Sequence, residues 1–139
     1  MAHLAAEWEA VHAADADALR VQAVPNQMQF APREIRVKAG KAVRILFENP
    51  DLMLHNFVLL RPGSAEEVGE LADRMAGQAE ALLRAYVPDS PNVIHATGLV
   101  QPGAKAELKF KAPGSPGRYP YLCTFPGHWR IMRGEMVVE

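Results

Sequence analysis

The chain has 139 residues, the usual size of one domain, so neither two independent cores nor a repeat array is expected. Apolar residues make up 49% of the chain and charged residues 22%, a balance typical of a folded globular domain rather than a disordered one. Fifteen Lys and Arg against 16 Asp and Glu give a formal net charge of -1, which supplies no broad basic field for nucleic acid or anionic lipid.

Membrane and export signals are not found in the sequence. No window reaches the roughly 18 apolar residues of a membrane-spanning helix, and the N-terminus lacks the basic patch and apolar stretch of a secretory leader. We therefore expect no transmembrane segment and no leader in this chain. The single cysteine, Cys123, excludes an intrachain disulfide, so cysteine usage leaves the compartment open.

The first half of the chain divides into an arm and a run of strands. Residues 1–19 are rich in alanine, with apolar residues on one helical face, which predicts an N-terminal arm or short helix ahead of a domain at 20–139. From Arg20 onward, apolar residues alternate and are interrupted by Pro and Gly, a pattern typical of strands and turns. A further strand is expected over 55–60.

One helical segment interrupts the strands. Ser64, followed three residues later by Glu67, predicts a capping box, and apolar residues at helical spacing continue from Val68 to Leu83, with Gly77 expected to break or weaken the helix. Strand patterns return over 93–96, 105–111, 119–123 and 135–139. Seven or eight short strands with one inserted helix predict an all-β fold, a β-sandwich.

The stretch from Cys123 to Met132 carries the chemistry. Pro126-Gly127 predicts a tight turn after a strand that ends at Cys123, so the sulfur, the imidazole of His128 and the thioether of Met132 converge from one loop. His55, near the start of another strand, supplies a fourth group if the two strand ends are neighbours. Two His, one Cys and one Met form the donor set of a blue-copper electron-transfer site, a trigonal His₂Cys plane with a weak axial Met.

These residues resemble those of the azurin-like cupredoxins, including the auracyanin-type small blue copper proteins. The resemblance covers about 21–139 and is carried by Asn26-Gln27-Met28-Gln29-Phe30, His55-Asn56-Phe57-Val58-Leu59, Cys123 to His128 and Met132-Arg133-Gly134. It implies a Greek-key β-sandwich with residues 64–86 as a flap outside it. It also implies one type 1 copper per chain, cycling between Cu(I) and Cu(II) in electron transfer, with His55, Cys123 and His128 as equatorial ligands and Met132 as the axial one.

The surroundings of the site follow from the same resemblance. It implies that Asn56 ties the two ligand loops together, and that the backbone N–H groups of Asn56 and Phe125 donate to the Cys123 sulfur. Azurins have Gly before the first His ligand, whereas this chain has Leu54, which leaves a fifth contact from that carbonyl open.

The resemblance also implies a docking surface and a location. The His128 ring edge is expected near the surface, within an apolar patch where redox proteins such as c-type cytochromes or oxidoreductases dock. The candidates for that patch are Leu52, Met53, Pro126, Trp129 and Ile131. A periplasmic or extracytoplasmic location is expected.

Other functions fit parts of the same pattern. An enzyme would use Cys123 as nucleophile and His128 as base, but no oxyanion-hole signature accompanies them and Met132 would have no role, so no enzymatic activity is expected. A zinc hydrolase needs an open fourth position, which Met132 fills. A copper carrier or storage protein, and an electron-entry module of a larger oxidoreductase, remain as alternatives. His95 has no neighbouring ligand in the sequence and is expected to be structural.

Overall fold

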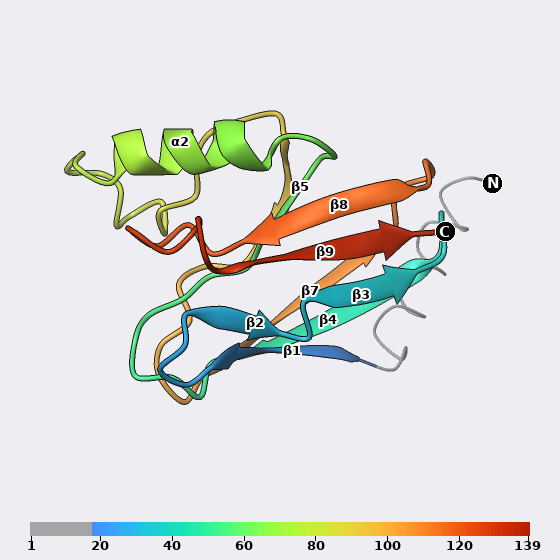
Figure 1. The fold of residues 1–139 in the computed structure, drawn as a ribbon, viewed down its shortest axis with the longest axis horizontal. Coiled ribbons are helices and arrows are strands. Elements are labelled where there is room, and N and C mark those ends of the chain that lie inside the picture. Colours follow the sequence, from blue (N-terminus) through green and yellow to red (C-terminus); the bar gives the residue numbers. More distant parts are fainter. Residues whose placement is uncertain (1–17) are drawn as a thin grey trace.

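The computed structural model describes residues 18–139, which form two β-sheets packed face to face with one helix outside them (Figure 1). The arm or short helix expected over 1–19 lies outside the described residues apart from its C-terminal end. The elements are β1 (Leu19–Val24), β2 (Gln29–Ala31), β3 (Glu34–Val37), β4 (Ala42–Glu48), β5 (Val58–Leu60), α2 (Ala65–Met75), β6 (Val93–Ala96), β7 (Lys105–Lys111), β8 (Gly117–Leu122) and β9 (Arg133–Val138). Within residues 18–139, no helix is long and apolar enough to cross a bilayer.

The strand order confirms the predicted all-β sandwich. One sheet has the order β2-β1-β4-β7 and the other β3-β9-β8-β5-β6. The pairs β1–β4 and β3–β9 are parallel, and the remaining pairs are antiparallel. Since sequential strands repeatedly change sheet, the long connections cross the ends of the sandwich, and loops distant in sequence meet there.

The described region has nine strands, one more than the upper end of the expected range. The additional strand arises around Pro32, where the chain leaves one sheet and enters the other: β2 pairs with β1, whereas β3 pairs with β9. Proline has no N–H to give to a ladder, so it stands between two short strands rather than within one.

Apolar side chains of both sheets fill the interior. Phe30, Phe47, Phe57 and Tyr121 are almost completely buried, and their rings form edge-on, tilted and stacked pairs, with Phe57 and Tyr121 stacked at a centroid distance of 4.7 Å. Geometry of this kind adds about 0.5–1.5 kcal/mol per pair beyond area burial. This aromatic cluster lies under the strand ends that carry the site.

A second apolar cluster explains why β5 is buried on both faces. Leu59 points into the main core, whereas Val58 and Leu60 point outward and are covered by α2 through Ala65 and Val68. Successive strand residues face opposite sides, so a strand that is apolar throughout needs a cover on each. The helix is that cover, and in Figure 1 it lies outside the sheet, near the C-terminal end of β8.

The helix ends just before Gly77, the residue expected to break it, whereas the predicted capping box is wrong. It ends at Met75, and residues 76–86 continue as turns. The Ser64 side chain makes no capping hydrogen bond, because its hydroxyl donates to the Arg61 carbonyl (2.6 Å), while Glu67 accepts from the Asn92 amide (2.6 Å). Both side chains therefore bond to partners outside the helix, and not to each other's backbone N–H groups as in a capping box.

Candidate metal centre

The pairing of β5 with β8 brings together the two segments that carry the candidate ligands. These strands are antiparallel neighbours with Val58 opposite Leu122, so the segment entering β5 lies beside the segment leaving β8. His55 precedes β5 and forms a bridge with Val100, while Cys123 directly follows β8. The neighbourhood that the sequence analysis left conditional is therefore present.

The loop after Cys123 is closed by its own backbone. Gly127 has φ = 84°, a left-handed conformation that favours glycine, and the His128 N–H donates to the Phe125 carbonyl (3.0 Å). The Met132 N–H donates to the His128 carbonyl (2.8 Å), and the Cys123 N–H donates to the Met132 carbonyl (3.1 Å). The turn thus folds His128 back over Cys123 and returns the chain to β9.

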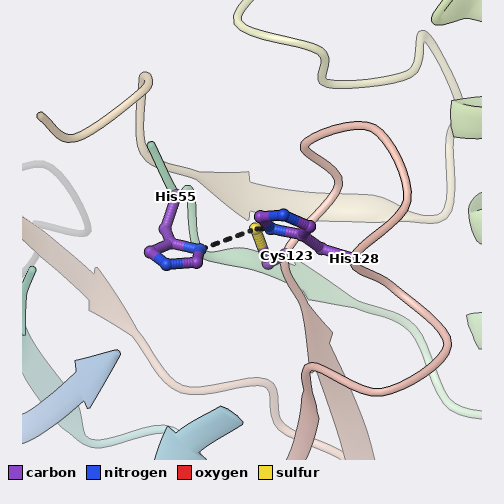
Figure 2. A group of neighbouring side chains, drawn as sticks. All are labelled: His55, Cys123 and His128. Atoms are coloured by element: carbon purple, nitrogen blue, oxygen red, sulfur yellow. Dashed lines mark hydrogen bonds between the residues drawn. The ribbon is translucent and has the colours of Figure 1, made fainter. Parts of the chain in front are cut away.

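Three side chains converge in this space. Figure 2 shows the imidazoles of His55 and His128 on either side of the Cys123 sulfur. The Nδ1 atoms lie 3.6 Å and 3.5 Å from Sγ, respectively, and the three donor atoms lie within 4.8 Å of one another. The side chains are buried, with exposed fractions of 0% for His55 and Cys123 and 1% for His128.

These separations fit a bound metal ion. Bonds of about 2.0 Å to an imidazole nitrogen and about 2.3 Å to a thiolate, meeting at about 110°, place the two donors about 3.5 Å apart. A thiolate with two imidazoles suits copper, since the soft sulfur favours Cu(I) and imidazole accepts both oxidation states. The donor geometry and chemistry therefore match the copper that the sequence predicted.

Burial sets the protonation states of the metal-free site. Desolvation raises the pKa of the Cys123 thiol to about 11, against the opposing effect of the N–H groups of Asn56 and Phe125. Desolvation, followed by repulsion from His55, lowers the pKa of His128 to about 4. Near neutral pH His128 therefore presents a neutral ring, and a metal that binds Cys123 as thiolate displaces its proton.

Met132 lies in the same loop and is fully buried. Its backbone is fixed by the hydrogen bonds to Cys123 and His128, so its side chain begins within the loop that carries the other donors. Leu54, next to His55, is half-buried.

Asn56 joins the two ligand loops. Its amide oxygen accepts the Thr124 N–H (2.7 Å), and its amide nitrogen donates to the Thr124 hydroxyl (2.9 Å) and to the Ala85 carbonyl (2.9 Å). The backbone N–H groups of Asn56 and Phe125 also act on the Cys123 sulfur by hydrogen bonding. These bonds connect the segments before β5 and after β8 with the turns that follow α2.

Asp51 is a neighbour of the site that the sequence analysis missed. Its Oδ2 lies 2.8 Å from Nε2 of His55, and the carboxylate is only 3% exposed. The hydrogen bond with His55 is the largest cause that lowers the pKa of Asp51, against desolvation. The available signal was an acidic residue four positions before His55 in an otherwise apolar loop.

The expected place of Trp129 in a docking patch is wrong, because its ring is buried against the helix. Trp129 is 3% exposed, and a Cβ at Gly69 of α2 would stand 2.2 Å from the ring. Its Nε1 donates to Asp73 (3.0 Å), which also accepts from Arg130 (2.9 Å), whose guanidinium lies over the indole. The helix therefore holds the loop that carries His128.

The other patch candidates are at least partly exposed. Leu52 is 83% exposed, Met53 42% and Ile131 60%, and Pro126 is half-buried. The His128 ring, expected near the surface, is itself 1% exposed; the Phe125 ring lies 5.0 Å from it, and Tyr86 packs edge-on against Phe125. His95 is apart from the cluster and stacks on Phe110 at 4.4 Å, which agrees with a structural role.

A β-sandwich with a buried Cys and two His at one end defines the class of the cupredoxins. The family of copper binding proteins that includes plastocyanin and azurin matches residues 17–139. The chain belongs to this family, and its function is therefore electron transfer with copper.

The individual relatives that the chain matches include auracyanins and azurins. The chain is 35% identical to Auracyanin-A of Chloroflexus aurantiacus over 82% of this chain and 69% of that one. It is 32% identical to Azurin of Pseudomonas aeruginosa over 82% of this chain and 80% of the relative. It spans only 54% of Auracyanin-B of Chloroflexus aurantiacus, at 31% identity.

Solved structures show the same fold. Auracyanin A, described as a "blue" copper protein from Chloroflexus aurantiacus, superposes with a TM-score of 0.78 at 31% identity, covering 88% of this chain and 98% of the other. The reduced auracyanin of Roseiflexus castenholzii superposes with a TM-score of 0.77 at 27% identity, covering 89% and 98%.

Proposed function

We propose that this protein is a one-electron carrier with a type 1 copper centre held by His55, Cys123 and His128 in the equatorial positions and Met132 in the axial one. The observation that carries this proposal is the convergence of one sulfur and two Nδ1 atoms within 4.8 Å in a buried site. Copper would supply the one-electron change between Cu(I) and Cu(II). No substrate is turned over.

The residues of the chain serve this function by staying in place. The loop hydrogen bonds, the Asn56 bridge and the packing of Trp129 on α2 hold the donors in a geometry between the preferences of the two oxidation states. Because little rearrangement then accompanies electron gain or loss, transfer is fast. The N–H groups of Asn56 and Phe125 withdraw charge from the Cys123 sulfur and tune the potential.

The partners we propose are redox proteins, such as c-type cytochromes or oxidoreductases. Leu52, Met53 and Ile131 expose apolar surface on the two ligand loops. Leu82 and Leu83, in the turns after α2, are also exposed at 60% and 89%. A partner that covers these side chains approaches the copper ligands from the loop side, near His128.

The unit that acts is the domain over 20–139, and we propose a periplasmic or extracytoplasmic location for it. The family match over residues 17–139 supports this domain. The resemblance to azurins and auracyanins supports the location. An electron-entry module of a larger oxidoreductase would use the same domain and the same site.

A copper carrier or storage protein is the second candidate from the sequence. A carrier exchanges its metal and favours accessible donors, whereas these donor side chains are 0–1% exposed. Their burial supports retention of the metal and so favours the electron carrier over a protein that exchanges its copper.

The test is the addition of Cu(II) to the purified protein. We expect intense visible absorption from thiolate-to-copper charge transfer, lost in Cys123→Ser and strongly reduced in His55→Ala. His95→Ala is the matched control, because His95 is a half-buried histidine outside the cluster, and this variant should remain blue. A colourless one-to-one copper complex of the wild-type protein would contradict the proposal.

A further inference from the structure

The Asp51 carboxylate meets the one ring nitrogen of His55 that does not face the other donors. Nδ1 of His55 points to the Cys123 sulfur at 3.6 Å, whereas Nε2 lies 2.8 Å from Oδ2 of Asp51. An ionised carboxylate only accepts hydrogen bonds, so the ring donates through Nε2–H. This bond leaves the Nδ1 lone pair directed at the site.

We propose that Asp51 is a positioning residue for the copper centre: its carboxylate selects the Nε2–H form of His55, so that Nδ1 binds the metal, and its negative charge favours the oxidised state. This inference rests on the proposed function for its effect on copper, but its effect on His55 exists without metal. A carboxylate on the distal nitrogen of a ligating histidine fixes the tautomer and raises its basicity.

The carboxylate is itself held in place. Oδ1 accepts the backbone N–H groups of Leu52 (2.8 Å) and Asn26 (3.1 Å), and Asn26 has a positive φ of 63° in the β1–β2 turn. The Asp51 N–H donates to the side-chain oxygen of Asn49 (3.1 Å). Because both carboxylate oxygens are engaged, the side chain is fixed in one orientation toward the ring.

The network closes on the backbone of His55. The Asn49 amide donates to the carbonyls of Met53 (2.8 Å) and Val100 (2.8 Å), and the Val100 N–H donates to the His55 carbonyl (2.7 Å). Asn49 is 1% exposed. The ring and the backbone of His55 are thus both fixed from one buried set of hydrogen bonds.

A single substitution, Asp51→Asn, removes the charge and reverses the tautomer together. Asn in place of Asp51 keeps the shape of the side chain but has only one acceptor oxygen. That oxygen can face either the backbone N–H groups of Leu52 and Asn26 or Nε2 of His55. Two backbone N–H groups hold that oxygen, so the NH₂ group turns toward Nε2, which must then accept. The His55 proton moves to Nδ1, the atom that the metal requires.

The first measurement uses metal-free, ¹⁵N-labelled protein, in which NMR of the imidazole nitrogens reports the tautomer. We expect Nε2–H at His55 in the wild type and Nδ1–H in Asp51→Asn. Glu107→Gln is the matched control, since it also removes a hydrogen-bonded carboxylate, one that pairs with Arg44 on the surface, and it should leave the tautomer unchanged. An Nδ1–H ring in the wild-type protein would overturn the proposal even if the variant failed to fold.

The second measurement uses the copper-loaded proteins. Loss of this partner should weaken copper binding about 10- to 100-fold. Loss of the charge should shift the ratio of reduced to oxidised protein at a given potential by about tenfold toward the reduced form, which is about 59 mV upward. Glu107→Gln should show neither effect. An unchanged affinity and potential in Asp51→Asn would refute the role of Asp51 at the metal.

The two proposals fail in different ways. If the wild type bound no copper in a blue form, the proposed function would be wrong, while the tautomer would still test the link between Asp51 and His55. If the wild type were blue and the variant matched it in tautomer and potential, the function would stand and the role of Asp51 would be wrong.

Discussion

Gly69 is the position where one added methyl group tests the contact between α2 and the ligand loop. An alanine Cβ there would lie 2.2, 2.3 and 2.5 Å from Cδ2, Cε3 and Cε2 of Trp129. Ordinary van der Waals contacts between carbon atoms begin at about 3.5 Å, so the indole has to move by about 1 Å. The indole N–H is hydrogen-bonded to Asp73, and the guanidinium of the next residue, Arg130, lies over the ring.

The magnitude follows from three terms. Overpacking costs about 1–3 kcal/mol, and loss of the bond from the indole to Asp73 costs about 1 kcal/mol. The helix propensity of Ala over Gly offsets about 1 kcal/mol. We therefore expect Gly69→Ala to lower the unfolding free energy of the metal-free protein by about 1–3 kcal/mol.

Urea unfolding of the metal-free protein measures this change, with Gly77→Ala as the control. A Cβ at Gly77 meets nothing within 4 Å, so this variant should be as stable as the wild type or slightly more stable. Because Trp129 follows His128, the copper-loaded Gly69→Ala protein should also show a shifted charge-transfer band. A Gly69→Ala protein as stable as the wild type would show that the helix does not restrain the loop.

Three further outcomes are expected. Between pH 7 and about 4, His128 by itself should lower the stability of the metal-free protein by about 3 kcal/mol, because the unfolded chain protonates His128 near 6.5 whereas its folded pKa is about 4. This contribution is zero above pH 6.5 and grows as the pH falls below it. Urea titrations at several pH values measure this loss, and an equal loss in His128→Gln would contradict the assignment to His128. Met132→Leu should keep the blue colour and raise the reduction potential, since it removes a weak donor from an apolar pocket. Voltammetry measures the potential, and a lower value would be inconsistent with an axial Met. Tyr121→Phe should lower the free energy of unfolding by about 1 kcal/mol, because it removes the hydrogen bond from the Tyr121 hydroxyl to the Pro32 carbonyl (2.9 Å). Thermal unfolding measures this loss. The blue colour should not change, and a change in colour would link this residue to the site.

The candidate site was predictable where its residues lie close together in sequence and have specific chemistry. Cys123, His128 and Met132 share one loop, so their proximity follows from ten residues of sequence. The approach of His55 depended on the neighbourhood of two strands, which alternation alone does not determine, and the resemblance supplied it. Pairing of β5 with β8 is the structural fact behind that expectation.

The features that were missed are set by packing between distant segments. Trp129 was expected in an exposed patch from the family resemblance, and nothing in the local sequence shows that its ring packs on α2 at Gly69. The Ser64 capping box was wrong because the Arg61 carbonyl and the Asn92 amide compete for its two groups. Asp51 was overlooked because its role depends on a backbone path that brings it back to His55.

The position of the strand ends has a consequence for attachment. Cys123 follows the end of β8 at one end of the sandwich, whereas β1 starts and β9 finishes at the opposite end (Figure 1). Any tether joined ahead of Leu19 or after Glu139 would therefore hold the protein by the end remote from its donors. A fused or anchored form would keep the copper loops pointing outward, within reach of a passing partner.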